Sequence, residues 1–200
     1  MAKFTELEKN RLKEEIKEIS HRLFIDKGFK STSLEDITSS VGIAKSSFYI
    51  FYESKEMLYM ELLGMEGEEI EDKIWPKVKA AKNIHLAIKV YLNEMTHELE
   101  SKILTQRLIY DLDEYKLVAR KLNPGYVASK TLISIVSLME FIKEHQATNE
   151  IIGEDPSVIA GTLRATLLIG SQKRDLQNYN YEMVRELLFE AVTNQIRNSL

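Results

Sequence analysis

The 200-residue sequence contains no cysteine. Disulfide bonds, thiolate zinc sites and cysteine nucleophiles are therefore excluded. Proline and glycine are scarce, with three and eight residues, and the long uninterrupted stretches that result favour helices over many short strands. A chain of this length that is 44% hydrophobic and 29% charged is typical of a globular protein with a buried core.

Long hydrophobic runs are also missing. The most apolar stretch, 131–142, is far shorter than the roughly 20 residues that span a bilayer. The first ten residues are polar and lack the apolar run of a signal peptide. We therefore expect a cytoplasmic protein with no membrane segment.

The chain has little excess charge of either sign. Its 27 basic and 31 acidic residues give a formal net charge of −4, which taken alone argues against nucleic-acid binding. The first sixty residues are neutral, however, with ten basic and ten acidic residues. The excess acid therefore lies in the rest of the chain, and a DNA-binding surface in the first sixty residues is not excluded.

Apolar spacing predicts a helix at the start of the chain. From 12 to 23 the apolar residues recur every three or four positions, and the helix ends near Gly28. A second, short helix follows and ends at Gly42. Thr32 and Glu35 form the capping box that we favour for its start.

The remaining pattern is helical as well. A third helix is expected within 43–52, and Ser54 is the expected N-cap of a fourth, which ends or bends at Trp75-Pro76. Later helices are expected over about 126–145, 156–172 and 181–198. With about nine helices and no convincing strand, the predicted fold class is all-α.

The segment 32–49 has the pattern of a helix-turn-helix. Apolar residues surround Gly42, and glycine tolerates the positive φ that a tight turn between two helices requires. In such a motif the second helix lies in the DNA major groove and presents its first residues to base edges. Here those residues are Lys45, Ser46 and Ser47.

Further donors follow the second helix of the motif. Tyr49, Tyr52 and Lys55 offer hydroxyl and ammonium groups suited to phosphate oxygens. A cation at a helix N-terminus opposes the helix dipole, so a phosphate is the better explanation of Lys55. The alternative for Tyr49 is a packed aromatic, and Phe48 is more readily explained as core.

These residues are part of a longer pattern whose order and spacing match a known family. The pattern comprises Gly28-Phe29, Thr32-Ser33, Asp36-Ile37, Val41-Gly42-Ile43, Lys45, Phe48-Tyr49, Tyr52 and Ser54-Lys55-Glu56-Met57-Leu58. Over about residues 10 to 60 this pattern resembles the N-terminal domain of the TetR family of bacterial transcriptional regulators. The departures are Thr38 and Val41 in place of alanine, Ser46 in place of glycine, and Tyr52 in place of phenylalanine.

The resemblance implies roles for individual residues. Thr32 or Ser33, Tyr49 and Lys55 correspond to phosphate contacts. Four further residues fall where family members meet bases or the adjacent backbone: Lys45, Ser46, Ser47 and Phe51. We expect a three-helix DNA-binding domain over 1–53 and a helical ligand-binding and dimerisation domain over 54–200, with 54–75 as the connecting helix.

The last two helices carry apolar stripes suited to a twofold four-helix interface. The resemblance implies the same pairing, whereas the alternative is that the stripes pack internally. The candidate interface residues are Val158, Leu163, Leu167, Val184, Leu188 and Val192.

An effector pocket is expected among the helices of the C-terminal half. Its candidate residues would line a largely apolar cavity, although each is more often plain core: Tyr91, Met95, Leu99, Leu108, Tyr115, Tyr126 and Met139. Few cations lie near these positions, so we expect an apolar or weakly polar effector.

No catalytic or metal-binding pattern is evident. The four histidines are dispersed without metal-ligand spacing, and no nucleophile elbow, phosphate loop or dinucleotide fingerprint occurs. We expect no enzyme, no cofactor and no metal. The leading hypothesis is a dimeric repressor that an effector releases from a palindromic operator. The alternative is a helical small-molecule-binding or protein-binding protein whose helix-turn-helix is only structural.

Overall fold

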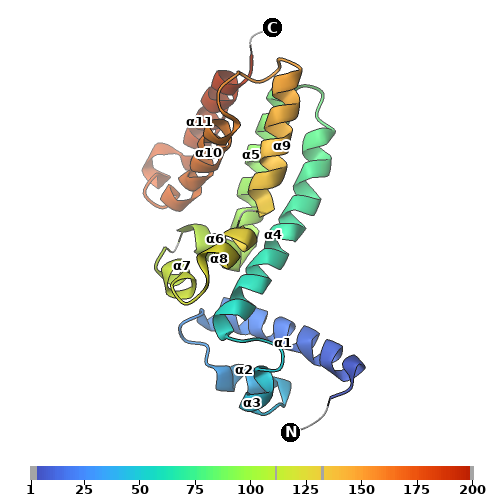
Figure 1. The fold of residues 1–200 in the computed structure, drawn as a ribbon. Coiled ribbons are helices and arrows are strands. Elements are labelled where there is room, and N and C mark those ends of the chain that lie inside the picture. The colour runs from blue at the N-terminus through green and yellow to red at the C-terminus, as the bar shows by residue number, and fades with distance from the viewer. Residues whose placement is uncertain (1–3, 111, 132, 199–200) are drawn as a thin grey trace. The chain divides into compact units, whose positions relative to one another are not determined.

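The computed structural model describes residues 4–110, 112–131 and 133–198, and within them it leaves undescribed the side chains of 108–110, 112, 115, 128–131 and 133–134. The described residues are helical (Figure 1), which confirms the all-α class. Their one β pairing is an isolated bridge between Ile151 and Arg197.

Eleven α-helices occur in the described residues, more than the nine or so expected. They are α1 (Glu6–Lys27), α2 (Leu34–Val41), α3 (Lys45–Phe48), α4 (Lys55–Lys79), α5 (Ile84–Ser101), α6 (Ile103–Tyr110), α7 (Leu112–Ala119), α8 (Pro124–Thr131), α9 (Ile133–Ala147), α10 (Pro156–Leu167) and α11 (Tyr181–Ile196), with short 3-10 turns at Leu168–Gln172 and Gln177–Tyr179. None of the described helices is long and apolar enough to cross a membrane.

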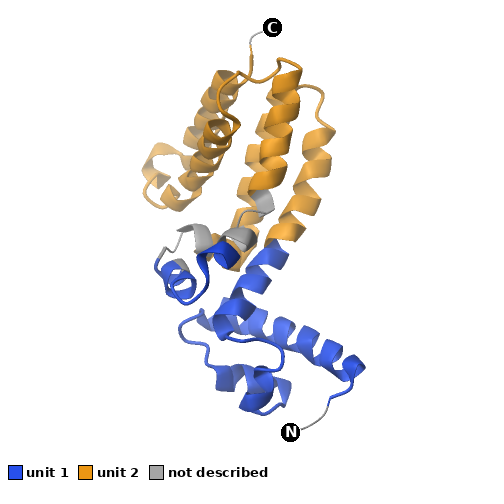
Figure 2. Cartoon of the chain, in the orientation of Figure 1, with its two compact units in different colours: residues 1–66, 111–131 blue, residues 67–110, 132–200 orange. Residues whose placement is uncertain are grey.

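The chain divides into two compact units (Figure 2). Unit 1 comprises Met1–Glu66 and Asp111–Thr131, and unit 2 comprises Gly67–Tyr110 and Leu132–Leu200. The division falls within α4. The expected domain boundary after residue 53 stays a prediction.

Unit 1 is organised around buried aromatic residues. The rings of Phe24, Phe29 and Tyr59 contact one another, with centroids 5.0 to 5.7 Å apart. Leu12 and Ile16 of α1 are also buried, as expected for the apolar face of this helix. These contacts join α1, the connection after it and the start of α4 into one core.

The start of α2 differs from the expected capping box. Ser33, not Thr32, is the N-cap: its hydroxyl accepts from the Asp36 N–H, and the Asp36 carboxylate accepts from the Ser33 N–H at 2.8 Å. The prediction of a Thr32–Glu35 box was wrong because the Thr32 hydroxyl turns inward, where it donates to the carbonyl oxygens of Leu23 and Gly28.

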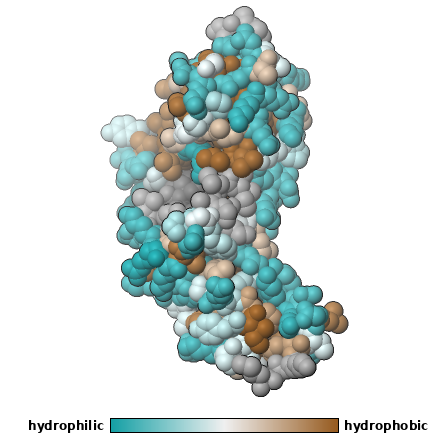
Figure 3. All heavy atoms as spheres, in the orientation of Figure 1, coloured by the Kyte–Doolittle hydropathy of each residue, from teal (hydrophilic) through white to brown (hydrophobic). Residues whose placement is uncertain are grey.

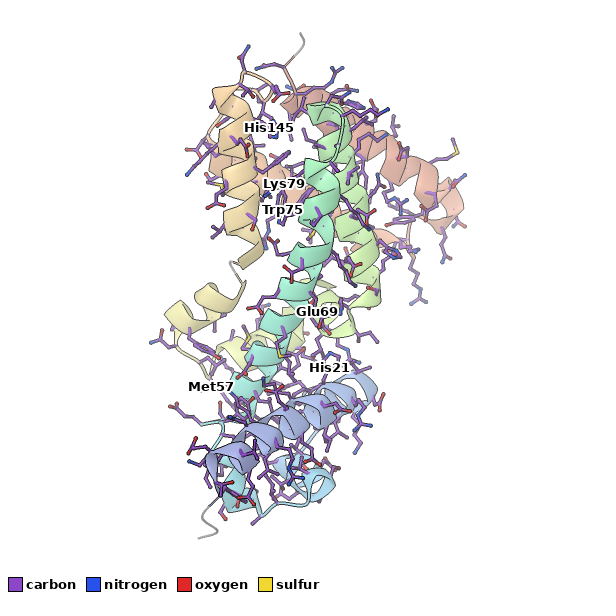
Figure 4. All side chains as sticks on the ribbon, turned by 90° about the vertical axis from the view of Figure 1, so that its right-hand side faces the viewer. His21, Met57, Glu69, Trp75, Lys79 and His145 are labelled. Carbon is purple, nitrogen blue, oxygen red and sulfur yellow. The ribbon has the colours of Figure 1, made fainter. Side chains whose placement is uncertain are left out.

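In unit 2, residues from α4, α5, α9, α10 and α11 form one hydrophobic core. Trp75 of α4 packs against Tyr91 and Phe141, with ring centroids 5.7 and 5.6 Å apart, and Figure 4 labels it on the α4 ribbon. The helix continues through Pro76 and ends three residues later at Lys79. The proline lacks the N–H that would bond to the Asp72 carbonyl, yet α4 does not end there.

Two of the later helices differ from the expected ranges. The helix expected over 126–145 is divided into α8 and α9, on either side of residue 132, which lies outside the described residues. The helix expected over 156–172 ends as α10 at Leu167 and continues as a 3-10 turn. The last helix is close to its expected range.

Candidate nucleic-acid interface

The turn between α2 and α3 depends on a left-handed glycine. Gly42 has φ 78° and ψ 28°, and its N–H donates to the carbonyl oxygens of Ser39 and Thr38. The Ile43 N–H donates to the Thr38 oxygen at 2.9 Å. These bonds end α2 and reverse the chain, as the sequence predicted for this position.

Beneath the turn, two apolar side chains hold the helices together. Ile37 of α2 and Phe48 of α3 are both 0% exposed. Because α3 has only four residues, packing of this kind, rather than the stability of the helix itself, must fix its position. Single hydrogen-bonded turns continue from Phe48 to Phe51 and Tyr52, so the regular helix is shorter than the 43–52 segment in which it was expected.

The start of α3 presents polar side chains to solvent. Lys45 and Ser46 are exposed, and Ser47 is partly exposed. The three residues expected to face base edges therefore lie together on accessible backbone at the beginning of the second helix, where a helix-turn-helix makes its base contacts.

Lys45 forms an ion pair with Glu35 of α2. The bond to Lys45 holds the pKa of the Glu35 carboxyl below its usual range, and the same bond raises the pKa of Lys45. Both side chains are more than half exposed, so the pair is screened by solvent and salt. The pair therefore holds the Lys45 ammonium only weakly.

Tyr49 is also accessible. It is 53% exposed, and its ring lies edge-on against Phe48, with centroids 5.8 Å apart. This contact restricts the ring while much of the side chain remains open to solvent. Phe51 is partly buried, and its ring centroid lies 6.2 Å from that of Phe4, so a residue that precedes α1 and its N-cap covers part of this candidate contact.

The two candidates at the start of α2 have different surroundings. Thr32 is 0% exposed and its hydroxyl is engaged internally. Ser33 is exposed, although its hydroxyl also bonds Asp36. Of the alternatives Thr32 or Ser33, only Ser33 lies at the surface of the chain.

Lys55 has internal partners that the sequence did not reveal. Its ammonium donates to the carbonyl oxygen of Phe29 at 2.7 Å and to that of Thr32, and it lies 4.1 Å from the centre of the Phe29 ring. Burial lowers the pKa of Lys55. An external phosphate is therefore not needed to explain this cation, because it satisfies carbonyl groups of the connection between α1 and α2.

Sequence reasoning missed two supports of unit 1. Glu114 of α7 accepts from the Tyr59 hydroxyl at 2.5 Å and from the Phe29 N–H at 3.3 Å. Glu56 pairs with Lys121 at 2.7 Å. Burial alone would raise the pKa of Glu56, but the bond to Lys121 contributes to a net lowering. No local pattern signals these contacts, because the partners are 55 to 85 residues apart.

Comparison with known proteins agrees with this geometry. Residues 18–62 match the family described as bacterial regulatory proteins, tetR family. Over these residues the chain is similar to the tetR family. The matched segment contains α2, α3 and the beginning of α4, and thus the exposed residues around the turn.

Three curated relatives, all named as HTH-type transcriptional regulators, match over 46 to 51 residues. The negative transcriptional regulator IcaR of the icaADBC biofilm operon of Staphylococcus epidermidis is 42% identical over 48 residues, which are 24% of this chain and 26% of IcaR. Three such relatives are matched over 16% to 26% of their own length. They are named as regulators of transcription, not as enzymes.

Solved structures extend the likeness of fold to nearly the whole chain. A tetR-family transcription regulator from Shewanella sp. PV-4 superposes with a TM-score of 0.70 over 94% of this chain and 99% of its own, at 18% identity. AibR, solved with isovaleryl coenzyme A and operator DNA, gives 0.60 over 90% and 98%, at 14% identity. At these identities the likeness concerns the fold.

The candidate pocket residues do not all lie in one unit. Tyr91, Met95 and Leu99 are buried in the core of unit 2, and Met139 packs against that core. Tyr126 is in unit 1. The side chains of Leu108 and Tyr115 lie outside the described residues. The pocket itself stays a prediction.

The candidate interface residues divide by exposure. Val158 is 57% exposed, while Val184, Leu188 and Val192 are partly exposed. Leu163 and Leu167 belong to the internal core of unit 2, so they are not available at the surface of the single chain. The most exposed apolar residues nearby are Met183 and Leu187 of α11, at 68% and 72%. Figure 3 shows apolar patches among hydrophilic side chains on the face that it draws.

Proposed function

We propose that this protein is a DNA-binding regulator of transcription and that it acts as a repressor on a palindromic operator. The observation that carries the proposal is the accessible group at the helix-turn-helix, in which Lys45, Ser46 and Tyr49 are exposed and Ser47 is partly exposed, within the segment that matches the tetR family. Short polar side chains at the start of the second helix suit base edges, and the tyrosine hydroxyl suits a phosphate.

We further propose that two copies bind together. Two recognition helices must lie about 34 to 36 Å apart to enter successive major grooves, and a single chain carries one. The apolar surface of α10 and α11 would join the copies. A small-molecule effector would release the operator, as long as it binds the DNA-bound and free conformations with different affinity. AibR, which has a similar fold, was solved in one complex with both isovaleryl coenzyme A and operator DNA, which supports a protein of this fold that binds a small molecule as well as DNA.

The proposal is tested by titrating the protein into a labelled duplex taken from upstream of its own gene and following fluorescence anisotropy at several salt concentrations. We expect affinity to fall as salt rises, because phosphate contacts release counterions. Lys45→Gln should weaken binding and reduce the log–log salt slope by about 1.

Arg22→Gln is the matched control, since Arg22 is an exposed cation on α1 with only a 3.9 Å contact to Glu18. It should leave affinity and slope unchanged. A wild-type affinity that is independent of salt, or equal losses in the two variants, would instead favour the alternative of a helical binding protein with a structural helix-turn-helix.

A further inference from the structure

Unit 2 contains an arginine, Arg164, with one buried nitrogen atom for which the described residues supply no hydrogen-bond acceptor. Arg164 of α10 is partly buried, and its Nη1 atom is buried without a hydrogen bond in the part of the chain that the structure describes. Lys89 of α5, in the same unit, is different, because it pairs with both Glu186 and Glu190 of α11. Arginine stays charged at all accessible pH values, and a buried charge without a partner is unfavourable. The position of Arg164 therefore calls for an explanation other than stability.

The surroundings of this guanidinium are aromatic. Leu163, which precedes Arg164 on α10, lies in the same hydrophobic core as Tyr91 of α5, whose side chain is 3% exposed, and the charge of Arg164 acts on the Tyr91 hydroxyl. The Tyr91 ring contacts Trp75, which in turn contacts Phe141 of α9. The three rings form a continuous aromatic cluster in the core of unit 2.

An acidic group near Tyr91 is already engaged. Glu71 of α4, whose charge also reaches Tyr91, accepts the indole N–H of Trp75 at 2.6 Å. It forms no ion pair with Arg164 among the described residues. Arg164 thus keeps donors for an acceptor that the chain itself does not supply.

We propose that unit 2 binds a monoanionic amphiphile, with a carboxylate on Arg164 and an apolar body against Trp75, Tyr91 and Phe141. The guanidinium fork matches a carboxylate and binds it by charge-assisted hydrogen bonds. The inference rests on the proposed function, since the ligand would be its effector. It also refines the expected apolar or weakly polar effector, which was based on the scarcity of nearby cations and did not include Arg164.

The first test compares acids with their matched alcohols. Decanoate with decan-1-ol, and 2-naphthoate with 2-naphthol, are titrated into the full chain without DNA by isothermal calorimetry. We expect at least one acid to bind tenfold or more tightly than its alcohol, and Arg164→Gln to remove that preference. Arg174→Gln, which deletes an exposed arginine of the same unit, should keep it.

The second test measures the free protein. Arg164→Met should raise the melting temperature by about 2 to 4 °C, because it replaces an unpaired buried charge by an apolar side chain, and should abolish stabilisation by the acid. Two results would overturn the proposal: no acid preferred over its alcohol, or unchanged acid affinity in Arg164→Gln with loss of a dimer, which would assign the guanidinium to an interface.

These outcomes separate the two proposals. Binding of the acid through Arg164 by a protein that does not bind DNA would refute the regulator and keep the site. Salt-dependent DNA binding by a protein that does not prefer either acid would refute the site and keep the regulator.

Discussion

Tyr49 combines a packed ring with an accessible polar edge. Its ring lies against the buried Phe48, and about half of the side chain remains exposed. The aromatic contact fixes the ring, so little side-chain entropy remains to be lost when the hydroxyl binds a phosphate.

Tyr49→Phe should therefore weaken DNA binding by about tenfold to a hundredfold, since a hydrogen bond to a charged group such as phosphate contributes about 1.5 to 3 kcal/mol. The ring contact with Phe48 is retained, so the melting temperature should be unchanged. Anisotropy with the upstream duplex and thermal melts of the same samples measure both. Unaltered affinity would mean that Tyr49 is only a packed aromatic.

Lys55 belongs to the fold of unit 1. Lys55→Met removes the donor to the Phe29 and Thr32 carbonyl groups and should lower the free energy of unfolding by about 1 to 3 kcal/mol. Urea denaturation measures this loss, and Lys30→Met, at an exposed site in the same unit, is the control. An unchanged midpoint would show that these bonds contribute nothing. Loss of DNA binding on replacing Lys55 would therefore not by itself indicate a phosphate contact.

At the scale of elements, the α2–α3 turn depends on one backbone conformation. A Cβ atom at Gly42 would meet nothing within 4 Å, so steric contact does not require glycine there. The positive φ of 78° does require glycine, because a left-handed conformation costs an ordinary residue about 1 to 2 kcal/mol.

Gly42→Ala should therefore destabilise unit 1 by about 1 to 2 kcal/mol and reduce DNA affinity through the position of α3. Gly42→Asn should lose less, since asparagine enters this region more readily. Chemical denaturation of the wild type and the two variants measures the free energy of unfolding of each and so ranks their stability. Equal stability of the alanine and asparagine variants would show that φ is not the cause.

The capping box of α2 makes its stability depend on pH. Bonds from the Ser33 backbone and hydroxyl hold the pKa of Asp36 below its ordinary value of 3.8. A carboxyl with a lowered folded pKa stabilises the protein above its unfolded pKa, and this contribution is lost as pH falls through the folded pKa.

Asp36→Asn should therefore melt below the wild type at pH 7, and the two melting temperatures should converge as the pH falls below the ordinary value of the carboxyl. Melting curves at several pH values measure the gap. Asp26→Asn, at an exposed position on α1, is the control. A gap that is constant with pH would assign the effect to side-chain shape rather than to charge.

Local signals predicted the elements better than their connections. The periodicity of α1, the glycine that ends α2 and the cap at Ser54, which accepts from the Met57 N–H at 3.1 Å, are properties of short segments, so they could be read from the sequence. The inward turn of Thr32 and the partners of Lys55 are set by tertiary contacts 9 to 26 residues away. No spacing rule includes such contacts.

The same difference applies to the candidate site. Lys45, Ser46 and Tyr49 were predicted as exposed donors, and they are exposed because they follow a turn whose chemistry is local. Leu163 and Leu167 of α10 have the same helical spacing as a surface stripe, yet they are core. Periodicity identifies an apolar face, but it does not say whether the chain or a second copy covers it.

For the whole molecule, the charge distribution limits how DNA can be bound. The first sixty residues are neutral and the remainder carries the formal charge of −4, so general attraction to phosphate is weak. Affinity must come from site-specific contacts. Coupling two heads in a dimer can raise affinity by about 10² to 10⁴ without any new contact in either head.

The exposed apolar residues of α11 provide a test of that coupling. Leu187 is 72% exposed, so it adds little to the core of its own chain. Leu187→Glu should leave the melting behaviour of the protomer intact, since the new charge remains in water. In a twofold interface the same substitution introduces two carboxylates close together without partners, which is strongly unfavourable.

We therefore expect Leu187→Glu to be monomeric by light scattering and to bind the operator about a hundredfold more weakly or worse. Leu7→Glu makes the same chemical change at a leucine of α1 that is 82% exposed, and it should remain dimeric. If Leu187→Glu also remains dimeric, the copies associate through another surface. If it is monomeric and binds the operator with full affinity, a single helix-turn-helix is sufficient, and the effector cannot act by changing the spacing of two heads.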